Sequence, residues 1–243
     1  MTNVSHRRTR DSRRLRALSR LPPKSDIAWF RRRLRLWFAH NRREFPWRHS
    51  NNPYLICVSE ILLQQTTARK VADLIGVFTA LYPDWTTLAK ASPTEIETVI
   101  YGLGIYRRRA KTFHSLASAV VTLESFPRTR SGLETLPGIG QYIANVLMVT
   151  LQRKRLPFLD VNMVRVLERF FGPRELADTR HDPFLQALAR AVVNVSDPLS
   201  ANWMILDFAA LFCTKRRPRC SHCTLLDRCL YGRTTLPRAS HGP

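Results

Sequence analysis

Residues 136–160, LPGIGQYIANVLMVTLQRKRLPFLD, constrain the fold more than any other stretch of the chain. The first five hold two glycines and a proline, the composition of a tight turn whose backbone N–H groups face outward. A helical pattern follows, with apolar residues at Ile143, Val146, Leu147 and Leu151. The stretch ends on Asp160, a single acid in an apolar run. Outward-facing N–H groups can bind a phosphate. A phosphate-binding turn followed by a lone carboxylate indicates a protein that acts on nucleic acid.

The charge of the chain points to the same partner. Its 243 residues carry 39 Lys and Arg against 18 Asp and Glu, a net charge of +21, which favours a polyanion. An anionic membrane surface is the alternative, but no apolar run approaches the roughly 20 residues that a membrane span needs. Hydrophobic residues make up 44%, enough for one large domain or two small lobes.

The N-terminal segment is the most basic part of the sequence. Residues 1–49 hold 15 basic and 3 acidic side chains, and residues 1–25 have almost no core-forming pattern. We expect residues 1–25 to form a flexible basic arm. An organellar transit peptide is the alternative, but Pro22 and Pro23 follow directly and no second signal supports it.

Helical spacing accounts for the apolar residues of the whole remaining chain, so the sequence predicts an all-α fold. Asp26 can cap a first helix over residues 26–41. Ser92 and Ser131 each stand three residues before a glutamate, the spacing of a capping box. Asp182 followed by a proline predicts another helix start.

Residues 54–82 are expected to be mostly helical, in two pieces, with an acid inside an apolar stretch. Glu60 and Gln64 are four residues apart and share one helix face. Acids are seldom buried without a partner, so Glu60 is either satisfied at the rim of the core or functional. The residues alone leave both interpretations open.

Four of the five cysteines lie near the C-terminus with the spacing C-x6-C-x2-C-x5-C: Cys213, Cys220, Cys223 and Cys229. The segments between them are polar and too short to bury a core, so a metal or disulfides must hold the loop. Only one pair is close in sequence, which favours a [4Fe–4S] cluster over zinc, whose sites usually use two short pairs. Disulfides would need an oxidising compartment. The fifth, Cys57, is expected to be an ordinary core residue.

The turn LPGIG, the Leu159-Asp160 pair and the four-cysteine loop together resemble the helix-hairpin-helix DNA glycosylases of the endonuclease III and MutY superfamily. The resemblance covers roughly residues 27–231. It implies two helical lobes with the DNA-binding cleft between them. Residues 50–155 would form a six-helix lobe with the hairpin, and residues 26–49 with 156–243 would form the iron–sulfur lobe.

The resemblance also implies roles for residues outside the hairpin. The segment SEILLQQT at residues 59–66 resembles the MutY segment that supplies a catalytic glutamate, here Glu60, and two wedge glutamines, here Gln64 and Gln65. Tyr106 matches the residue that probes the opposite base. Tyr142 stands where bifunctional members carry the lysine that forms a Schiff base. Because tyrosine cannot form that imine, a strand-cutting lyase is not expected.

The implied reaction is removal of one base from double-stranded DNA by a monomeric enzyme of base excision repair. Gly138, Gly140 and Gln141 would hold a backbone phosphate through their amides. The base must leave the stack, and Asp160 would stabilise the oxocarbenium-like sugar or act as a transient nucleophile. The alternative role for Asp160 is an N-cap of the following helix, and the two roles are compatible.

The chain resembles two groups of this superfamily that remove different bases. MutY enzymes remove adenine opposite G or 8-oxoguanine, and an acid such as Glu60 suits protonation of a purine, so adenine is preferred. MutY enzymes usually carry a second, C-terminal domain, whereas QQTTA and the length of this chain also resemble the Mig-type thymine glycosylases, which act on T opposite G. A non-catalytic iron–sulfur DNA-binding module or sensor is a further alternative.

The expected location follows from the same reaction. A bacterial or archaeal protein would act in the cytoplasm at the nucleoid, and a eukaryotic one in the nucleus or an organelle.

Overall fold

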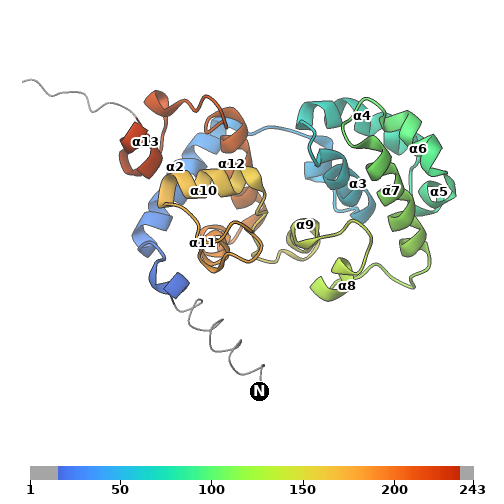
Figure 1. The fold of residues 1–243 in the computed structure, drawn as a ribbon, viewed down its shortest axis with the longest axis horizontal. Helices are drawn as coiled ribbons and strands as arrows, with labels where there is room; N and C mark the ends of the chain where they lie inside the picture. The colour runs from blue at the N-terminus through green and yellow to red at the C-terminus, as the bar shows by residue number, and fades with distance from the viewer. Residues whose placement is uncertain (1–15, 236–243) are drawn as a thin grey trace, which may run out of the picture. The chain divides into compact units, whose positions relative to one another are not determined.

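The computed structural model describes residues 16–235, and every regular element among them is helical (Figure 1). The predicted all-α fold is confirmed. The chain divides into two compact units, one formed by Glu44–Lys154 and the other by residues 1–43 and 155–243. Within residues 16–235, no helix is long and apolar enough to cross a membrane.

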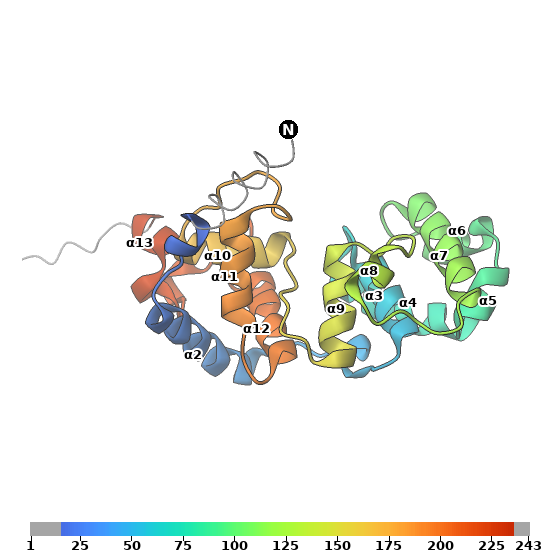
Figure 2. The same cartoon turned by 90° about the horizontal axis from the view of Figure 1, so that it is seen from below.

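The unit formed by Glu44–Lys154 is built around two packed helices, α7 and α3. Helix α7 contacts α5 and α6, and α3 contacts α4, α7 and α9 (Figure 2). Phe78 and Phe113 lie between these helices with ring centroids 5.0 Å apart and no exposed surface. The bounds of the elements are η1 Pro46–His49, α3 Pro53–Leu63, α4 Ala68–Leu81, α5 Trp85–Lys90, α6 Pro93–Ile100, α7 Tyr106–Val121, α8 Arg130–Glu134 and α9 Gln141–Gln152.

One of the two predicted capping boxes is confirmed in this unit. The Ser92 hydroxyl accepts a hydrogen bond from the Glu95 amide at 3.2 Å, and the Ser92 amide donates to the Glu95 carboxylate at 2.7 Å. The prediction for Ser131 was wrong. Thr129 caps α8 instead, because its hydroxyl accepts from the Gly132 amide at 3.1 Å and the helix already starts at Arg130.

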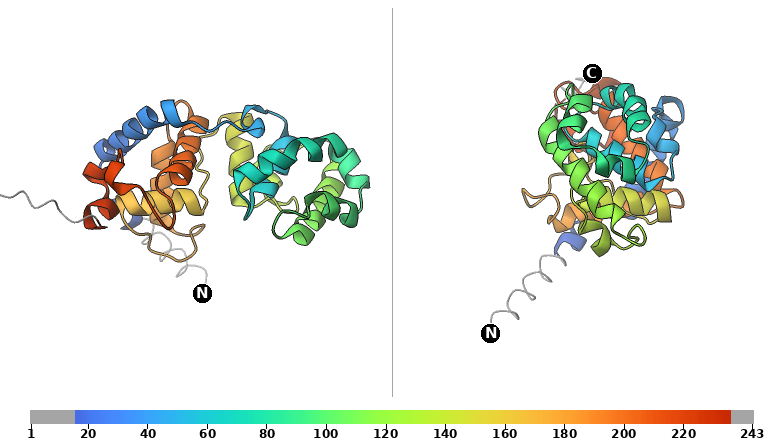
Figure 3. Two further views of the ribbon diagram at one scale, coloured as in Figure 1. Left: turned by 90° about the horizontal axis from the view of Figure 1, so that it is seen from above. Right: turned by 90° about the vertical axis from the view of Figure 1, so that its right-hand side faces the viewer.

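The second unit packs α12 against α2 and α10 (Figure 1 and Figure 3). Phe30 of α2 is fully buried, with its ring centroid 4.8 Å from that of Phe170 and 5.1 Å from that of Phe171. The elements are α2 Lys24–Asn41, α10 Val161–Phe171, α11 Pro183–Val193, α12 Pro198–Leu211, η2 Cys220–His222, η3 Leu226–Arg228 and α13 Leu230–Thr235.

The predicted start of the first helix was two residues late. Helix α2 begins at Lys24 after Pro23, a residue well suited to precede a helix, and Asp26 lies in its first turn. The Asp26 carboxylate accepts a hydrogen bond of 2.9 Å from Arg228 instead of capping the helix.

Two segments differ from their expected places. Residues 44–49 were expected in the iron–sulfur lobe, but they belong to Glu44–Lys154 because η1 packs against α3. Most of the predicted basic arm lies outside the described residues. Its described end is packed: Ala17 is 1% exposed, and the Arg20 guanidinium pairs with Glu175 at 2.5 Å and lies 4.5 Å from the Phe184 ring centroid.

Candidate functional site

The turn between α8 and α9, residues 136–140, is a type II turn by its sequence and hydrogen bonding. The Ile139 amide donates to the Leu136 carbonyl at 3.1 Å, Pro137 occupies the second position, and Gly138 has φ +81°. A Cβ on Gly138 would lie 2.3 Å from Cγ2 of Thr112 on α7. Only glycine satisfies both demands, so this hairpin turn is seated directly on α7.

The N-terminus of α9 follows the hairpin turn and lacks a side-chain cap. Gly140 is the N-cap residue, with φ −96° and no atom within 4 Å of an added Cβ. The first amides of a helix have no partner within the helix, and here they belong to Gln141 and its neighbours. Tyr142, in the same turn, is half-buried. This end of α9 therefore has the properties of an anion-binding helix start.

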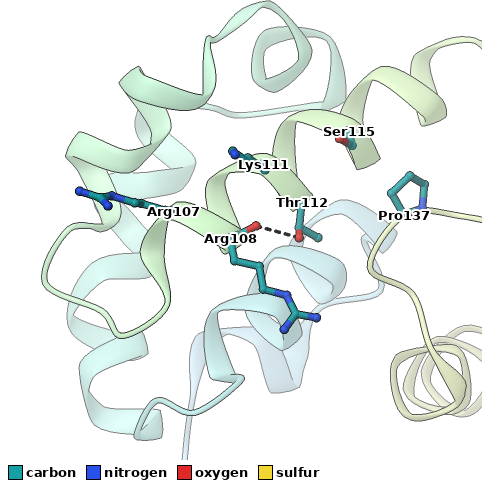
Figure 4. A pocket seen from close by; sticks show the side chains of 6 residues that line it. All are labelled: Arg107, Arg108, Lys111, Thr112, Ser115 and Pro137. Atoms are coloured by element: carbon teal, nitrogen blue, oxygen red, sulfur yellow. Dashed lines mark hydrogen bonds between the residues drawn. The ribbon is translucent and has the colours of Figure 1, made fainter.

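A pocket of about 470 Å³ lies between the N-terminal half of α7 and Pro137 of the hairpin turn (Figure 4). Arg107, Arg108 and Lys111 line it, and Figure 4 shows the two arginines leaving the helix in different directions. Helix α7 contains no acidic residue, and none of the three cations forms an ion pair within the described part of the chain. The surface beside the hairpin turn is thus strongly basic.

Residues 63–66, which we call the glutamine turn, form a second type II turn directly after α3. The Thr66 amide donates to the Leu63 carbonyl at 3.2 Å, and Gln64 has φ −59° and ψ 117°. Gln65 has φ 55°, a left-handed conformation that favours glycine. Both glutamine side chains are exposed. The chain holds these two polar side chains outside the core on a strained turn.

The loop of residues 102–106, which we call the tyrosine loop, leads into α7 with similar strain. Ile105 has φ 54° and ψ 26°, an outlier for a β-branched residue. Tyr106 follows as the first residue of α7, half-buried, with its ring centroid 4.9 Å from that of Tyr101. Tyr106 and the two glutamines, all predicted to contact DNA, lie in the same unit.

Glu60 lies in the last turns of α3 and is only 9% exposed. Its neighbour Cys57 is fully buried, as expected for a core residue; burial, together with the charge of Glu60, raises the pKa of this thiol. Helix α3 packs against α9, which carries Tyr142, so Glu60 and Tyr142 stand on contacting helices. Glu60 is therefore a nearly buried acid, and its functional role stays a prediction.

Asp160 lies in the other unit and is the N-cap residue of α10. This is one of the two roles predicted for it. Its Oδ1 accepts hydrogen bonds from the amides of Asn162 at 3.0 Å and Met163 at 2.8 Å, and Oδ2 accepts from the Asn162 side chain at 2.5 Å. Burial raises the pKa of this carboxyl, and the three hydrogen bonds oppose the rise. The result is a desolvated carboxylate held in one orientation.

A network behind Asp160 was not predicted from the sequence. Arg165 donates to the Asn162 side-chain oxygen at 3.1 Å and to the Cys213 carbonyl at 2.9 Å. It fixes the Asn162 amide so that its nitrogen faces Asp160. Arg165 stands one helical turn after Asn162, and this i, i+3 spacing was the signal available in the sequence.

The four C-terminal cysteines line one cavity, together with apolar side chains of α10 and α12. Burial raises the pKa of the Cys223 thiol to about 11, with smaller contributions from the neighbouring thiols. Arg169 donates to the Cys213 sulfur at 3.3 Å, and the Leu225 and Gly232 amides donate to the sulfurs of Cys223 and Cys229 at 3.4 Å. These donors suit thiolates that carry negative charge.

The geometry of the cysteines bears on the kind of metal they could bind. Among the described residues, no three His, Cys, Asp or Glu side chains are arranged around a single ion. A single zinc ion needs its ligands to converge on one point, whereas a cubane cluster offers a separate iron to each thiolate. The four thiols line one cavity, and the [4Fe–4S] cluster stays a prediction.

The sequence of this chain matches a known family through the region just described. Residues 58–182 match the HhH-GPD superfamily of base excision DNA repair proteins. The chain belongs to this superfamily. The HhH-GPD match spans Glu60, the glutamine turn, the hairpin turn and Asp160, and it ends before the four cysteines.

Individual relatives within the HhH-GPD superfamily differ in their target bases. A thymine-DNA glycosylase of Aeropyrum pernix is 36% identical over 86% of this chain and 96% of its own length. A thymine/uracil-DNA glycosylase of Pyrobaculum aerophilum is 34% identical over 85% and 93%. An adenine DNA glycosylase of Buchnera aphidicola is 28% identical over 80% of this chain but 57% of its own length.

Two solved structures have the same fold as this chain. A thermostable thymine-DNA glycosylase superimposes with a TM-score of 0.80 at 30% identity, over 86% of this chain and 98% of its own. Endonuclease III in a non-covalent complex with DNA superimposes with a TM-score of 0.78, over 88% of this chain and 98% of its own. Because the two sequences are only 21% identical, this likeness shows the fold alone.

Proposed function

We propose that this protein is a DNA glycosylase of base excision repair that removes thymine or uracil opposite guanine and leaves the strand intact. The preference for adenine expected from Glu60 is not favoured. The thymine and thymine/uracil glycosylases match the chain at higher identity and over nearly their whole length, whereas the chain covers about half the length of the adenine glycosylases. The observation that carries the proposal is the half-buried carboxylate of Asp160, held in one orientation by three hydrogen bonds, in a chain of this family.

Binding to DNA would begin at the hairpin turn. The uncapped amides at the start of α9 suit one backbone phosphate, and the cations of α7 beside them suit the neighbouring backbone. The glycosidic bond is inaccessible in a duplex, so the target nucleotide must be extruded. Gln64, Gln65 and Tyr106 would fill the space that it leaves.

Asp160 would stabilise the positive charge that develops on the sugar as the base departs. The carboxylate must be ionised for this; burial raises its pKa, and its hydrogen bonds from Asn162 and the Met163 amide favour the ionised form and oppose that rise. Water would then complete hydrolysis at the sugar. A pyrimidine base needs no ring protonation of the purine kind, so Glu60 would hydrogen-bond the extruded base instead.

Tyr142 supports the monofunctional part of the proposal. A lyase forms an imine between a lysine amine and the sugar, and the phenol of Tyr142 has no amine to offer. The expected product is therefore an abasic site in an unbroken strand.

The four cysteines would hold a [4Fe–4S] cluster. A bound cluster would supply a rigid centre for residues 213–229, which are mostly polar and have little core of their own. Their sulfurs line one cavity and accept hydrogen bonds from Arg169 and two amides, as a negatively charged cluster requires. No catalytic step proposed above depends on it.

The direct test uses a labelled duplex with one T·G mismatch, incubated with the protein and then split in two. Strand breakage should appear only in the half heated with alkali. Asp160→Asn should bind the duplex but release no base. Breakage without alkali would refute the role of Tyr142, and full activity of Asp160→Asn would refute the role of Asp160.

A further inference from the structure

Three consecutive arginines begin α7, and the third differs from the other two. Arg107 and Arg108 are exposed, whereas Arg109 is 2% exposed and is one of the largest fully buried side chains of the described structure. No acidic side chain forms an ion pair with it in residues 16–235, and burial lowers the pKa of its guanidinium. A guanidinium remains charged even so, and a buried charge must be satisfied by hydrogen bonds.

Backbone carbonyls provide most of that satisfaction. Nε donates to the Ile61 carbonyl at 3.0 Å, and Nη2 donates to the Gln64 carbonyl at 2.6 Å. Nη2 also donates to the Thr66 hydroxyl at 3.1 Å. Three of the four acceptors therefore lie at the end of α3 and in the glutamine turn.

The fourth acceptor lies in the tyrosine loop. Nη1 donates to the Gly104 carbonyl at 2.6 Å, and the backbone amide of Arg109 donates to the Ile105 carbonyl at 3.0 Å. One residue thus binds two loops that are separated by about forty positions in the sequence, and it does so through a planar, rigid group.

The same two loops carry backbone strain. Of the three non-glycine residues with positive φ in residues 16–235, Gln65 lies in the glutamine turn and Ile105 in the tyrosine loop. Such conformations persist only where the surroundings determine them strongly, and they gather at functional sites. In each loop the residue just before the strained one, Gln64 or Gly104, accepts a hydrogen bond from Arg109 through its carbonyl oxygen.

We propose that Arg109 is a positioning residue that fixes the glutamine turn and the tyrosine loop to each other, so that Gln64, Gln65 and Tyr106 enter DNA as one rigid unit. This rests on the proposed function, because it assigns those three side chains to the space left by the extruded base. Arg109 itself is buried and acts through the two loops it binds.

The test compares Arg109→Lys with wild-type protein and with Lys90→Gln, an exposed charge on α5 of the same unit. Lysine keeps the charge but has no planar fork to bridge three carbonyls. Three measurements are made below the melting temperature, with the fold checked by circular dichroism. The first is the affinity for an undamaged duplex. The second is the fluorescence of 2-aminopurine beside a T·G mismatch, which rises when the neighbouring base unstacks, and the third is the single-turnover rate of base release.

Arg109→Lys should bind the undamaged duplex like wild type, because the hairpin turn is untouched. It should lose most of the fluorescence rise, and its single-turnover base release should fall by about 100-fold, the scale expected for a misplacement near 1 Å. Lys90→Gln should match wild type in all three. A parallel loss of binding, fluorescence and folded signal would mean that Arg109 only stabilises the fold, and would overturn the proposal.

A second comparison covers the case in which Arg109→Lys does not fold. Thr66→Val keeps the arginine and removes one acceptor, and it should show the same pattern to a smaller degree. In a protein that already carries Gln64→Ala and Gln65→Ala, either substitution should reduce base release by a smaller factor than in wild type. The reason is that the two glutamine side chains that Arg109 positions are then absent. Equal losses in both backgrounds would contradict the proposal. If no mismatch is processed at all, the proposed function fails, while binding and fluorescence still decide the role of Arg109.

Discussion

The side-chain amide of Asn162 donates a hydrogen bond of 2.5 Å to Oδ2 of Asp160. This bond favours the ionised carboxylate, so it lowers a pKa that burial raises. Base release needs the ionised form, and the rate should therefore fall as the pH drops through the pKa of Asp160. Asn162→Ala removes the bond and should move this acid limb of the pH–rate profile to higher pH.

The size of the effect follows from the strength of such a bond. A hydrogen bond to a charged group contributes about 1.5 kcal/mol, so single-turnover release by Asn162→Ala should be about tenfold slower at pH values on the acid limb. Asn41→Ala, at an exposed asparagine of α2, serves as the control and should keep the wild-type profile. An acid limb that stays in place in Asn162→Ala would show that the amide does not tune Asp160.

Gly138 and Gly140 should respond differently to alanine. Gly138→Ala places a Cβ 2.3 Å from Thr112 at φ +81°, which we expect to cost about 2 kcal/mol of stability. It should also weaken DNA binding, because the hairpin turn must lift from α7. Gly140→Ala meets no atom within 4 Å and should melt close to wild type. Thermal unfolding of both variants checks this, and equal melting temperatures would contradict the docking of the hairpin turn on Thr112.

The sequence predicted the helices, the hairpin and Asp160 because local signals determine them. The predictions from sequence were wrong or incomplete where two local signals competed, or where contacts between distant residues determine the structure. Ser131 and Thr129 both have the chemistry of an N-cap, and only the observed hydrogen bond to Gly132 distinguishes them. Neither the Asn162–Arg165 contact nor its link to the Cys213 carbonyl has a local pattern beyond spacing.

Arg109 shows the same limit in another form. Residue type alone does not separate one of three consecutive arginines from the others. Arg109 stands four residues before Phe113, on the helix face that continues through Leu116, and this periodicity marked it as the buried one. Its acceptors could not have been predicted, since two of them lie in turns more than forty residues earlier.

The basic pocket beside the hairpin turn predicts a specific salt dependence. Arg108→Gln should lower the slope of log affinity against log salt concentration by about 0.9 if its guanidinium neutralises one phosphate. Lys90→Gln removes the same charge elsewhere in the unit and should leave the slope unchanged. Fluorescence anisotropy with an undamaged duplex measures both. An unchanged slope in Arg108→Gln would exclude the pocket from the DNA contact.

The cysteine loop predicts the metal content of the purified protein. Iron and acid-labile sulfide should be present in equal amounts, and Cys223→Ala should lose both. Cys57→Ala, at a buried thiol of α3 away from the cavity, should retain them at a modest cost in stability from the small void. Zinc without iron in the wild-type protein would overturn the cluster assignment.

The target base can be determined by one competition between two substrates. Two duplexes, one with a T·G mismatch and one with adenine opposite 8-oxoguanine, are mixed in equal amounts with limiting protein, and abasic sites are counted on each. We expect thymine to be released at least about tenfold faster than adenine, a difference of about 1.4 kcal/mol in transition-state stabilisation. Faster release of adenine, or release from neither duplex, would contradict it.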